Sequence, residues 1–258
     1  MVDINFLNRK YFCKNYEVPF RLKCNSFIYL YPIKVRDWDI FEECFDILSI
    51  DKNKTQDPKI IQMSYLKFLF FLIERKDLVS EEIKTKLYLT LKLCFREKDI
   101  RLGYDKGKPV IIICEDDKIK AKITAKEFND IKRIIFYQNI ENYDDEEISE
   151  DIKKIINEYK QVKNGNIIPL TLEDKLIFLG NEIGKDTNEL LNMTYREFSK
   201  RFSMSVDKMD YVINKTAELS GNFKVDKPMP HLLYKDKTGK YDKYFVDKDG
   251  FVDKINNA

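Results

Sequence analysis

Residues 187–221 read TNELLNMTYREFSKRFSMSVDKMDYVINKTAELSG, and this stretch decides how the second half of the chain folds. Thr194 stands three residues before Glu197, which is the spacing of a capping box at a helix start. Gly221 then offers a helix stop. The sequence therefore predicts a long helix over 195–219. Its apolar face recurs every three or four residues, as a helix requires: Phe198, Phe202, Val206, Met209 and Ile213.

Most of the remaining chain shows the same helical spacing. Thr124 and Glu127 form a second capping box, Asp57-Pro58 marks a helix start with proline in the first turn, and Ser80 is a candidate N-cap. The segments with this spacing are 37–48, 58–73, 80–94, 124–135, 148–159 and 171–183.

An acidic cluster precedes one of these segments. Asp144, Asp145, Glu146 and Glu147 stand immediately before an apolar face. Negative charges at a helix N-terminus complement the helix dipole. The cluster is therefore explained by a helix whose face consists of Ile148, Ile152, Ile155, Ile156 and Tyr159.

Three stretches have strand character instead. Residues 109–114 (PVIIIC), a turn at 115–118 and an alternating run at 119–123 predict a β-hairpin within about 101–124. Residues 27–35 are rich in aromatic and β-branched residues but contain a proline, which limits them to an edge or a short strand. In the polar tail, a second hairpin is predicted over 232–247.

Together these patterns predict an α+β fold that is mainly α-helical, with small hairpins at about 101–124 and 232–247 and an extended N-terminal segment. A polar linker with one glycine follows residue 160 and indicates a boundary. We expect an N-terminal mixed helical domain over 1–160, a C-terminal helical module over 170–221, and a polar tail or arm over 222–258.

Composition excludes several classes of protein. Hydrophobic residues make up 43% of the chain, which excludes full disorder, and the net charge of +2 gives no electrostatic reason to bind nucleic acid. Five scattered cysteines without a CxxC pair argue against a zinc site or a disulfide framework. The longest apolar run, 65–73, is too short to span a bilayer and holds a lysine. We therefore expect no membrane among the partners.

No catalytic motif is present, and the candidate groups have simpler explanations. His231, the single histidine, lies between Pro230 and Leu232 without a neighbouring nucleophile; a hydrolase would need a pocket that joins it to a cysteine or carboxylate. The acidic pair Asp116-Asp117 fits a hairpin turn, and neither it nor the 144–147 cluster has EF-hand spacing. We expect no enzyme activity, no metal and no cofactor.

A DNA-binding regulator is the alternative interpretation. Helices 171–184 and 195–219 could be read as a helix-turn-helix pair, with Arg196, Lys200, Arg201 and Lys208 on the recognition helix. However, the segment between them is longer than the usual three- or four-residue turn, and acids share the second helix. We therefore do not expect nucleic acid as a partner.

Residues 171–221 resemble phage-encoded virion and tail-assembly proteins of Gram-positive hosts. The residues that carry the resemblance are LED (172–174), LL (190–191), Met193-Thr194, Phe198 and Phe202. The earlier order, a YPI strand at 31–33, an apolar helix, a hairpin and a helix near IIFYQN (134–139), is similar too. "MT-x-x-E-F" segments also occur in tail assembly chaperones.

The resemblance implies a non-enzymatic structural or assembly protein that binds other virion proteins, such as tail or tape-measure proteins. It implies a homo-oligomer or part of a larger assembly, located in the host cytoplasm during assembly or in the virion. We expect contacts through helix 195–219 and the tail, at Tyr195, Phe198, Phe202, Met209, Tyr234 and Tyr244.

Overall fold

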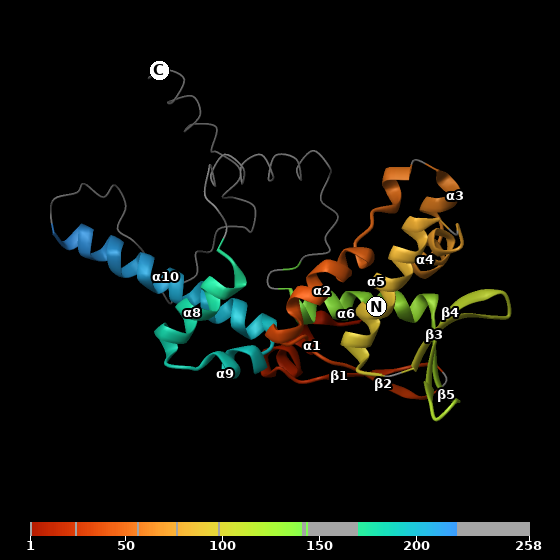
Figure 1. Cartoon of the computed structure of the whole chain (residues 1–258), viewed down its shortest axis with the longest axis horizontal. Helices are drawn as coiled ribbons and strands as arrows, with labels where there is room; N and C mark the ends of the chain where they lie inside the picture. Colours follow the sequence, from red (N-terminus) through yellow and green to blue (C-terminus); the bar gives the residue numbers. More distant parts are fainter. Residues whose placement is uncertain are drawn as a thin grey trace, which may run out of the picture. The chain divides into compact units, whose positions relative to one another are not determined.

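The protein forms two compact units in a computed structural model of the whole chain, which describes residues 2–23, 25–55, 57–75, 77–97, 99–140, 143 and 170–220 (Figure 1). The first unit comprises Met1–Tyr143 together with Ile183–Arg201. The second comprises Asp144–Glu182 together with Phe202–Ala258. Helices and small antiparallel sheets make up an α+β fold, as the sequence predicts.

The first unit holds most of the elements. Its helices are α1 Ile4–Lys10, α2 Trp38–Phe45, α3 Pro58–Ile61, α4 Tyr65–Ile73, α5 Leu78–Phe95, α6 Ala125–Asn139 and α9 Thr187–Asn192. Its strands are β1 Val18–Arg21, β2 Phe27–Leu30, β3 Asp99–Asp105, β4 Lys108–Glu115 and β5 Lys118–Thr124. Short 3-10 turns lie at Phe12–Lys14, Val35–Asp37, Asp46–Leu48 and Lys52–Thr55.

The N-terminal segment is only partly extended. β1 and β2 pair as an antiparallel hairpin, with Val18 opposite Leu30, and this part of the prediction is confirmed. Before them, however, α1 is helical, so the prediction of an extended segment is wrong there. The Asp3 carboxylate caps α1 by accepting a hydrogen bond from the Phe6 amide at 3.0 Å, and Leu7 is buried.

A three-stranded antiparallel sheet, in the order β3-β4-β5, replaces the single hairpin predicted for 101–124. The hairpin of β4 and β5 is confirmed, with Asp116 and Asp117 in the turn at positive φ. The sequence analysis missed β3, which pairs with β4 through a turn at Lys106-Gly107, also at positive φ. Positive φ at two successive residues is the geometry of a tight hairpin turn.

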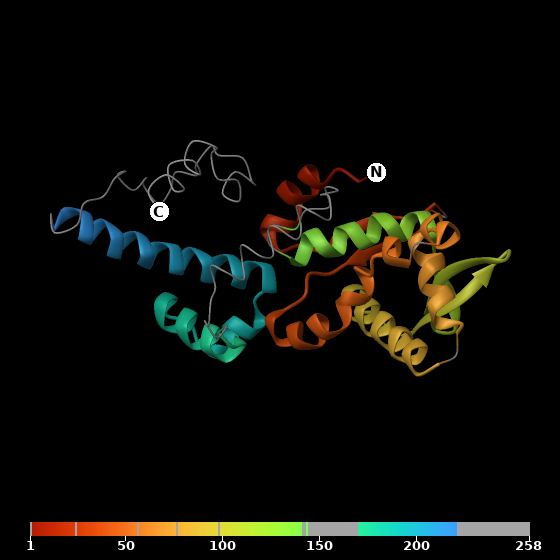
Figure 2. The same cartoon turned by 90° about the horizontal axis from the view of Figure 1, so that it is seen from above.

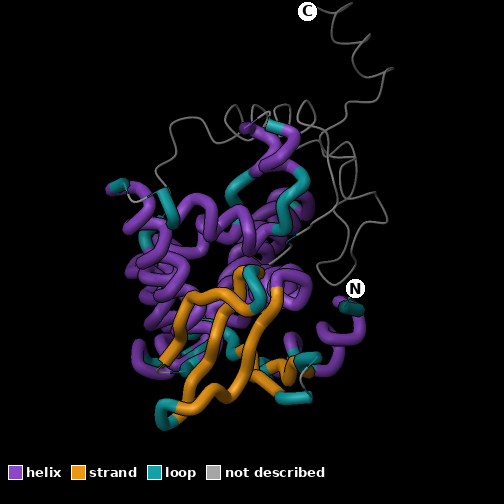
Figure 3. The backbone as a smooth tube through the Cα atoms, turned by 90° about the vertical axis from the view of Figure 1, so that its right-hand side faces the viewer, coloured by secondary structure: helices purple, strands orange, loops and turns teal. Residues whose placement is uncertain are grey.

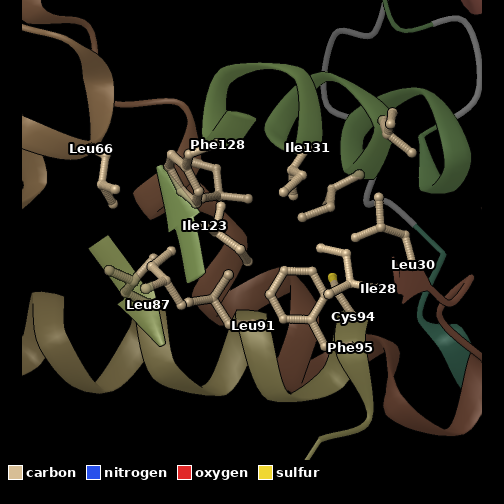
Figure 4. Close-up of a cluster of buried hydrophobic side chains, with 14 of the residues drawn as sticks. Ile28, Leu30, Leu66, Leu87, Leu91, Cys94, Phe95, Ile123, Phe128 and Ile131 are labelled. Carbon is tan, nitrogen blue, oxygen red and sulfur yellow. The ribbon is translucent and has the colours of Figure 1, made fainter. Parts of the chain in front are cut away.

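Helices cover the buried face of this sheet (Figure 3). α4 contacts β4, α5 contacts β3, and α6 contacts β5. The core between them is apolar and closely packed, as the close-up in Figure 4 shows. Fully buried members of this core include Leu66, Leu87, Leu91, Cys94, Ile123, Phe128 and Ile131.

Two helix starts differ from the sequence prediction. The run 58–73 divides into α3 and α4, because Ser64 caps a new helix by accepting from the Lys67 amide at 3.4 Å. α5 begins after Asp77, not Ser80, because the Asp77 carboxylate accepts from the Ser80 amide at 2.8 Å. An aspartate three residues earlier therefore outcompetes the serine as the cap.

α6 carries the polar contacts that organise the first unit. The predicted capping box of Thr124 and Glu127 is confirmed. The Glu127 carboxylate also accepts from the Lys23 amide at 2.7 Å, which joins the helix to the β1–β2 turn. At the other end of α6, the Asn139 side chain accepts from the Ile33 amide at 2.7 Å, and the Gln138 side chain donates to the Leu30 carbonyl at 3.1 Å.

The segment 183–201 belongs with the N-terminal body, not with a separate C-terminal module over 170–221. Its backbone is bonded to the chain that follows β2. The Val35 amide donates to the Met193 carbonyl at 3.0 Å, the Tyr195 amide donates to the Ile33 carbonyl at 2.8 Å, and Lys34 and Thr194 form an isolated β-bridge. These bonds fix the position of α9 and the start of the long helix α10 within the first unit.

The second unit contains α8, Leu172–Ile183 as far as Glu182, and the part of α10, Tyr195–Leu219, that begins at Phe202. Thr171 and Asp174 exchange hydrogen bonds at the start of α8. The predicted helix over 148–159 and hairpin over 232–247 lie outside the described residues. None of the helices in the described ranges is long and apolar enough to cross a membrane.

Candidate protein-interaction surface

α10 is one unbroken helix from Tyr195 to Leu219, as predicted (Figure 2). A row of side chains at alternating spacings of four and three residues follows its length: Phe198, Phe202, Ser205, Met209, Val212, Thr216 and Leu219. Side chains at this spacing share one face of a helix. The row is therefore the natural contact face of α10.

The two halves of the row differ in exposure. Phe198 is 1% exposed and Ser205 is buried. Further along, Met209 is 45%, Val212 54% and Leu219 78% exposed, and Ile213 beside them is 62% exposed. The apolar pattern thus continues past the part of the helix that is buried. We call Met209, Val212, Thr216 and Leu219 the distal row.

The four described candidate residues occupy different environments. Tyr195 is partly buried and stacks on Trp38 with ring centroids 3.2 Å apart. Phe198 is inside the protein and offers no surface in this structure, whereas Phe202 is partly exposed and meets the edge of Phe178 at 5.5 Å. Met209 is exposed. The other two candidates, Tyr234 and Tyr244, lie outside the described residues.

Asn15 organises the start of α10, and the sequence analysis missed it. Its side-chain amide donates to the Glu197 carboxylate at 2.6 Å, and its carbonyl oxygen accepts from the Thr194 hydroxyl at 2.7 Å. Thr194 still caps the helix, because its hydroxyl accepts from the Glu197 amide at 3.3 Å. The backbone of Asn15 is left-handed, with φ of 58°, a conformation that asparagine tolerates. The available sequence signal was an asparagine in a polar turn.

Charged side chains flank the exposed half of α10. Lys208 pairs with Glu182 of α8 at 2.6 Å, and Lys215 pairs with Glu218 at 2.9 Å, which raises the pKa of Lys215. Both lysines directly precede residues of the distal row and so share one flank. Asp210 lies on the opposite flank, beyond Ile213.

A groove of about 730 Å³ lies in the first unit, between the chain after β2 and α9. Its walls carry equal numbers of cations and acids: Lys34, Arg96, Lys185, Arg201, Glu17, Asp186, Glu189 and Glu197. Lys185 pairs with Glu189 at 2.9 Å, and Arg201 pairs with Glu197 at 2.7 Å. Because the charges balance, the groove shows no preference for an anionic or a cationic ligand.

The titratable groups do not form a reactive constellation among the described residues. Burial raises the pKa of the Cys94 and Cys44 thiols, which disfavours the nucleophilic thiolate. Asp117 of the acidic turn pairs with Arg101 at 3.1 Å. Within the described ranges, no group of three histidine, cysteine or acidic side chains is placed to hold a metal ion. His231 lies outside these ranges.

The helix-turn-helix interpretation gains no support from the geometry. α9 lies between α8 and α10, in place of a short turn. Three of the four basic residues on the supposed recognition helix are engaged within the chain: Arg196 donates to Asn8 at 3.1 Å, Arg201 pairs with Glu197, and Lys208 pairs with Glu182.

No protein-family model, no curated protein and no solved structure matches the chain.

Proposed function

We propose that this protein is a non-enzymatic assembly protein that binds another protein through the exposed half of α10. The observation that carries the proposal is that apolar side chains on the contact face of α10, and Ile213 beside that face, are exposed beyond the buried part of the helix. Met209, Val212, Ile213 and Leu219 are all about half exposed or more. Contiguous exposed apolar surface on a folded protein is typical of a protein-binding site.

The helical form of the surface supports a protein as the partner. An apolar face at spacings of three and four residues is the pattern by which helices dock into grooves or against other helices. The resemblance of 171–221 to phage tail-assembly proteins supplies the class of partner that we propose, namely virion proteins such as tail or tape-measure proteins. We propose that binding occurs in the host cytoplasm during assembly.

Co-purification from cells that co-express the chain with the tail and capsid proteins of neighbouring genes tests this function. We expect one of these proteins to be retained by the full chain. Retention of none of them, or equal retention by a chain with Val212→Asp and Ile213→Asp, would remove the proposal. Binding of DNA in a low-salt gel-shift assay would favour the regulator instead.

A further inference from the structure

The hairpin of β1 and β2 has one buried face and one face open to solvent. Ile28 and Leu30 are buried and point into the core, where α5 and α6 contact β2 (Figure 4). Side chains alternate between the two faces of a strand, so their neighbours lie on the other face. Phe27 and Tyr29 are accordingly 51% and 47% exposed. We call this side the outer face, and it consists of Glu17, Pro19 and Arg21 in and beside β1 and Phe27, Tyr29 and Tyr31 in and beside β2.

The register of the hairpin arranges these side chains in two rows. Tyr29 is directly opposite Pro19, and Phe27 is opposite Arg21. Glu17 and Tyr31 continue this register by one position, and both line the same groove. The outer face therefore has an aromatic row on the β2 side and opposite charges at the two ends of the row on the β1 side.

The two charges of the β1 row form no ion pair within the described part of the chain. Arg21 makes one exposed hydrogen bond, to the side chain of Asn25 at 3.0 Å, and Glu17 is exposed. Residues four positions apart on a strand are separated by about 13 Å, which is too far for Arg21 and Glu17 to pair with each other. Each charge is therefore available to an opposite charge on another molecule.

We propose that the outer face binds the same face of a second copy of this chain, in a dimer with two-fold symmetry. The symmetry axis lies between the two faces and crosses the strands at the level of Tyr29. In a two-fold interface, a contact from one residue to another is repeated in reverse. Arg21 of each copy then faces the partner's Glu17, Phe27 faces the partner's Tyr31, and Tyr29 faces the partner's Tyr29.

Arg96 is a second cation near the outer face, and it fits the same arrangement. Its guanidinium group lies over the ring of Tyr31, 4.3 Å from the ring centroid, and so belongs to the aromatic row. In the dimer this position faces the partner's Phe27, whereas the partner's Arg21 lies on the β1 side. A cation beside an aromatic ring is a favourable contact.

The outer face fits a second copy better than a single-stranded nucleic acid. Exposed aromatic rings and arginines can stack bases and pair with phosphates. Glu17, however, places a negative charge at one end of the face, where it would repel a phosphate. In the symmetric dimer the same carboxylate faces an arginine, so both charges of the β1 row are opposed by their opposites.

The area of the outer face indicates a weak dimer. A half-exposed aromatic side chain presents about 100 Å² to solvent, so the whole face presents about 400–500 Å² on each copy. An interface that buries about 1,000 Å² in total is at the lower limit for specific association. We therefore expect a dimer that forms at micromolar concentrations and dissociates on dilution.

Sedimentation velocity of the isolated full-length chain tests this interface. We expect the unchanged chain to dimerise with rising concentration. Arg21→Glu and Glu17→Arg should each weaken the dimer by about ten-fold, because each variant brings like charges together at both ends of the interface. Mixed in equal amounts, the two variants should associate again, since every changed residue then faces its opposite charge. Circular dichroism establishes that each variant is folded.

The exposed half of α10 supplies the control. Ile213→Asp should dimerise like the unchanged chain, and loss of the dimer in this variant with its retention in Arg21→Glu would place the interface on α10 and overturn the proposal. A chain that stays monomeric up to about 0.5 mM, or two variants that do not associate when mixed, would also overturn it. Binding of a thymidine oligonucleotide that is lost in Phe27→Ala would show nucleic acid as the occupant instead. The assay contains no other protein, so its result does not depend on the proposed function.

Discussion

Substitution of Asn15 should detach the start of α10 from the body of the first unit. The side chain makes two partly buried hydrogen bonds, one to the Glu197 carboxylate at 2.6 Å and one from the Thr194 hydroxyl at 2.7 Å. A neutral hydrogen bond contributes about 1 kcal/mol and one to a charged group about 1.5–3 kcal/mol. Because both hydrogen bonds are only partly buried, their combined contribution is smaller than the sum of these values, and Asn15→Gly should lower the free energy of unfolding by about 2 kcal/mol.

The backbone adds a separable contribution. Asn15 has φ of 58°, which glycine adopts freely and alanine does not. Asn15→Ala should therefore cost about 1 kcal/mol more than Asn15→Gly. Asn25 is the matched control: it also has positive φ, at 63°, but it is exposed and accepts a single exposed hydrogen bond, from Arg21. Asn25→Gly should be nearly neutral.

Urea denaturation followed by tryptophan fluorescence measures these differences. Trp38 is the single tryptophan, and it stacks on Tyr195 beside this junction, so its emission reports the contact directly. Asn15→Gly should shift the unfolding midpoint while leaving the slope unchanged. If Asn15→Gly and Asn25→Gly both stay within about 0.5 kcal/mol of the unchanged chain, the assignment of Asn15 as the anchor is wrong.

Three further predictions concern the core, the pH dependence and the tail. Leu91→Ala should lower the free energy of unfolding by about 2–5 kcal/mol, because Leu91 is fully buried. Leu78 is 92% exposed, so Leu78→Ala should change the free energy of unfolding by less than about 0.5 kcal/mol in the same urea titration. Burial opposes ionisation of Glu127, but hydrogen bonds from Thr124 and Lys23 prevail and lower the pKa of its carboxyl group. The stability that the ionised carboxylate gives to the fold is therefore complete above the ordinary glutamate pKa of about 4.3, and it is lost as the pH falls through the lowered pKa. Glu127→Gln should therefore reduce stability at pH 7 by about 1–2 kcal/mol and make little difference at the lowest pH of a thermal-melt series; an equal loss at every pH would contradict this. Deletion of 222–258 should leave the circular dichroism of the folded chain intact but weaken co-purification of a virion protein, and unchanged retention would refute a role for the tail.

Local sequence signals predicted most of the helices. The capping box at Thr124, the N-cap at Thr194 and the apolar spacing of α10 act within a few residues, so the sequence alone reveals them. The same locality explains the errors. Asp77 and Ser80 are both residue types that cap helices well, so the sequence alone does not show which of the two begins the helix.

Local sequence patterns do not predict contacts between residues that are far apart in the chain. β3 has little alternation, and it becomes a strand because it pairs with the apolar β4. The anchoring of Thr194 and Glu197 by Asn15 joins residues more than a hundred and fifty positions apart, and no periodicity encodes such a bond. For the same reason, Phe198 was expected on an interface, whereas its burial depends on long-range packing.

The central claim is that the exposed half of α10 binds a partner, and one comparison tests it most directly. Ile213→Asp places a charge in the exposed apolar surface, whereas Asn214→Asp places the same charge one residue further, on another side of the helix. In co-purification with the tail and capsid proteins that we propose as partners, we predict that Ile213→Asp loses the partner and Asn214→Asp retains it, with both variants folded. Retention of the partner by Ile213→Asp at the level of the unchanged chain would contradict the account.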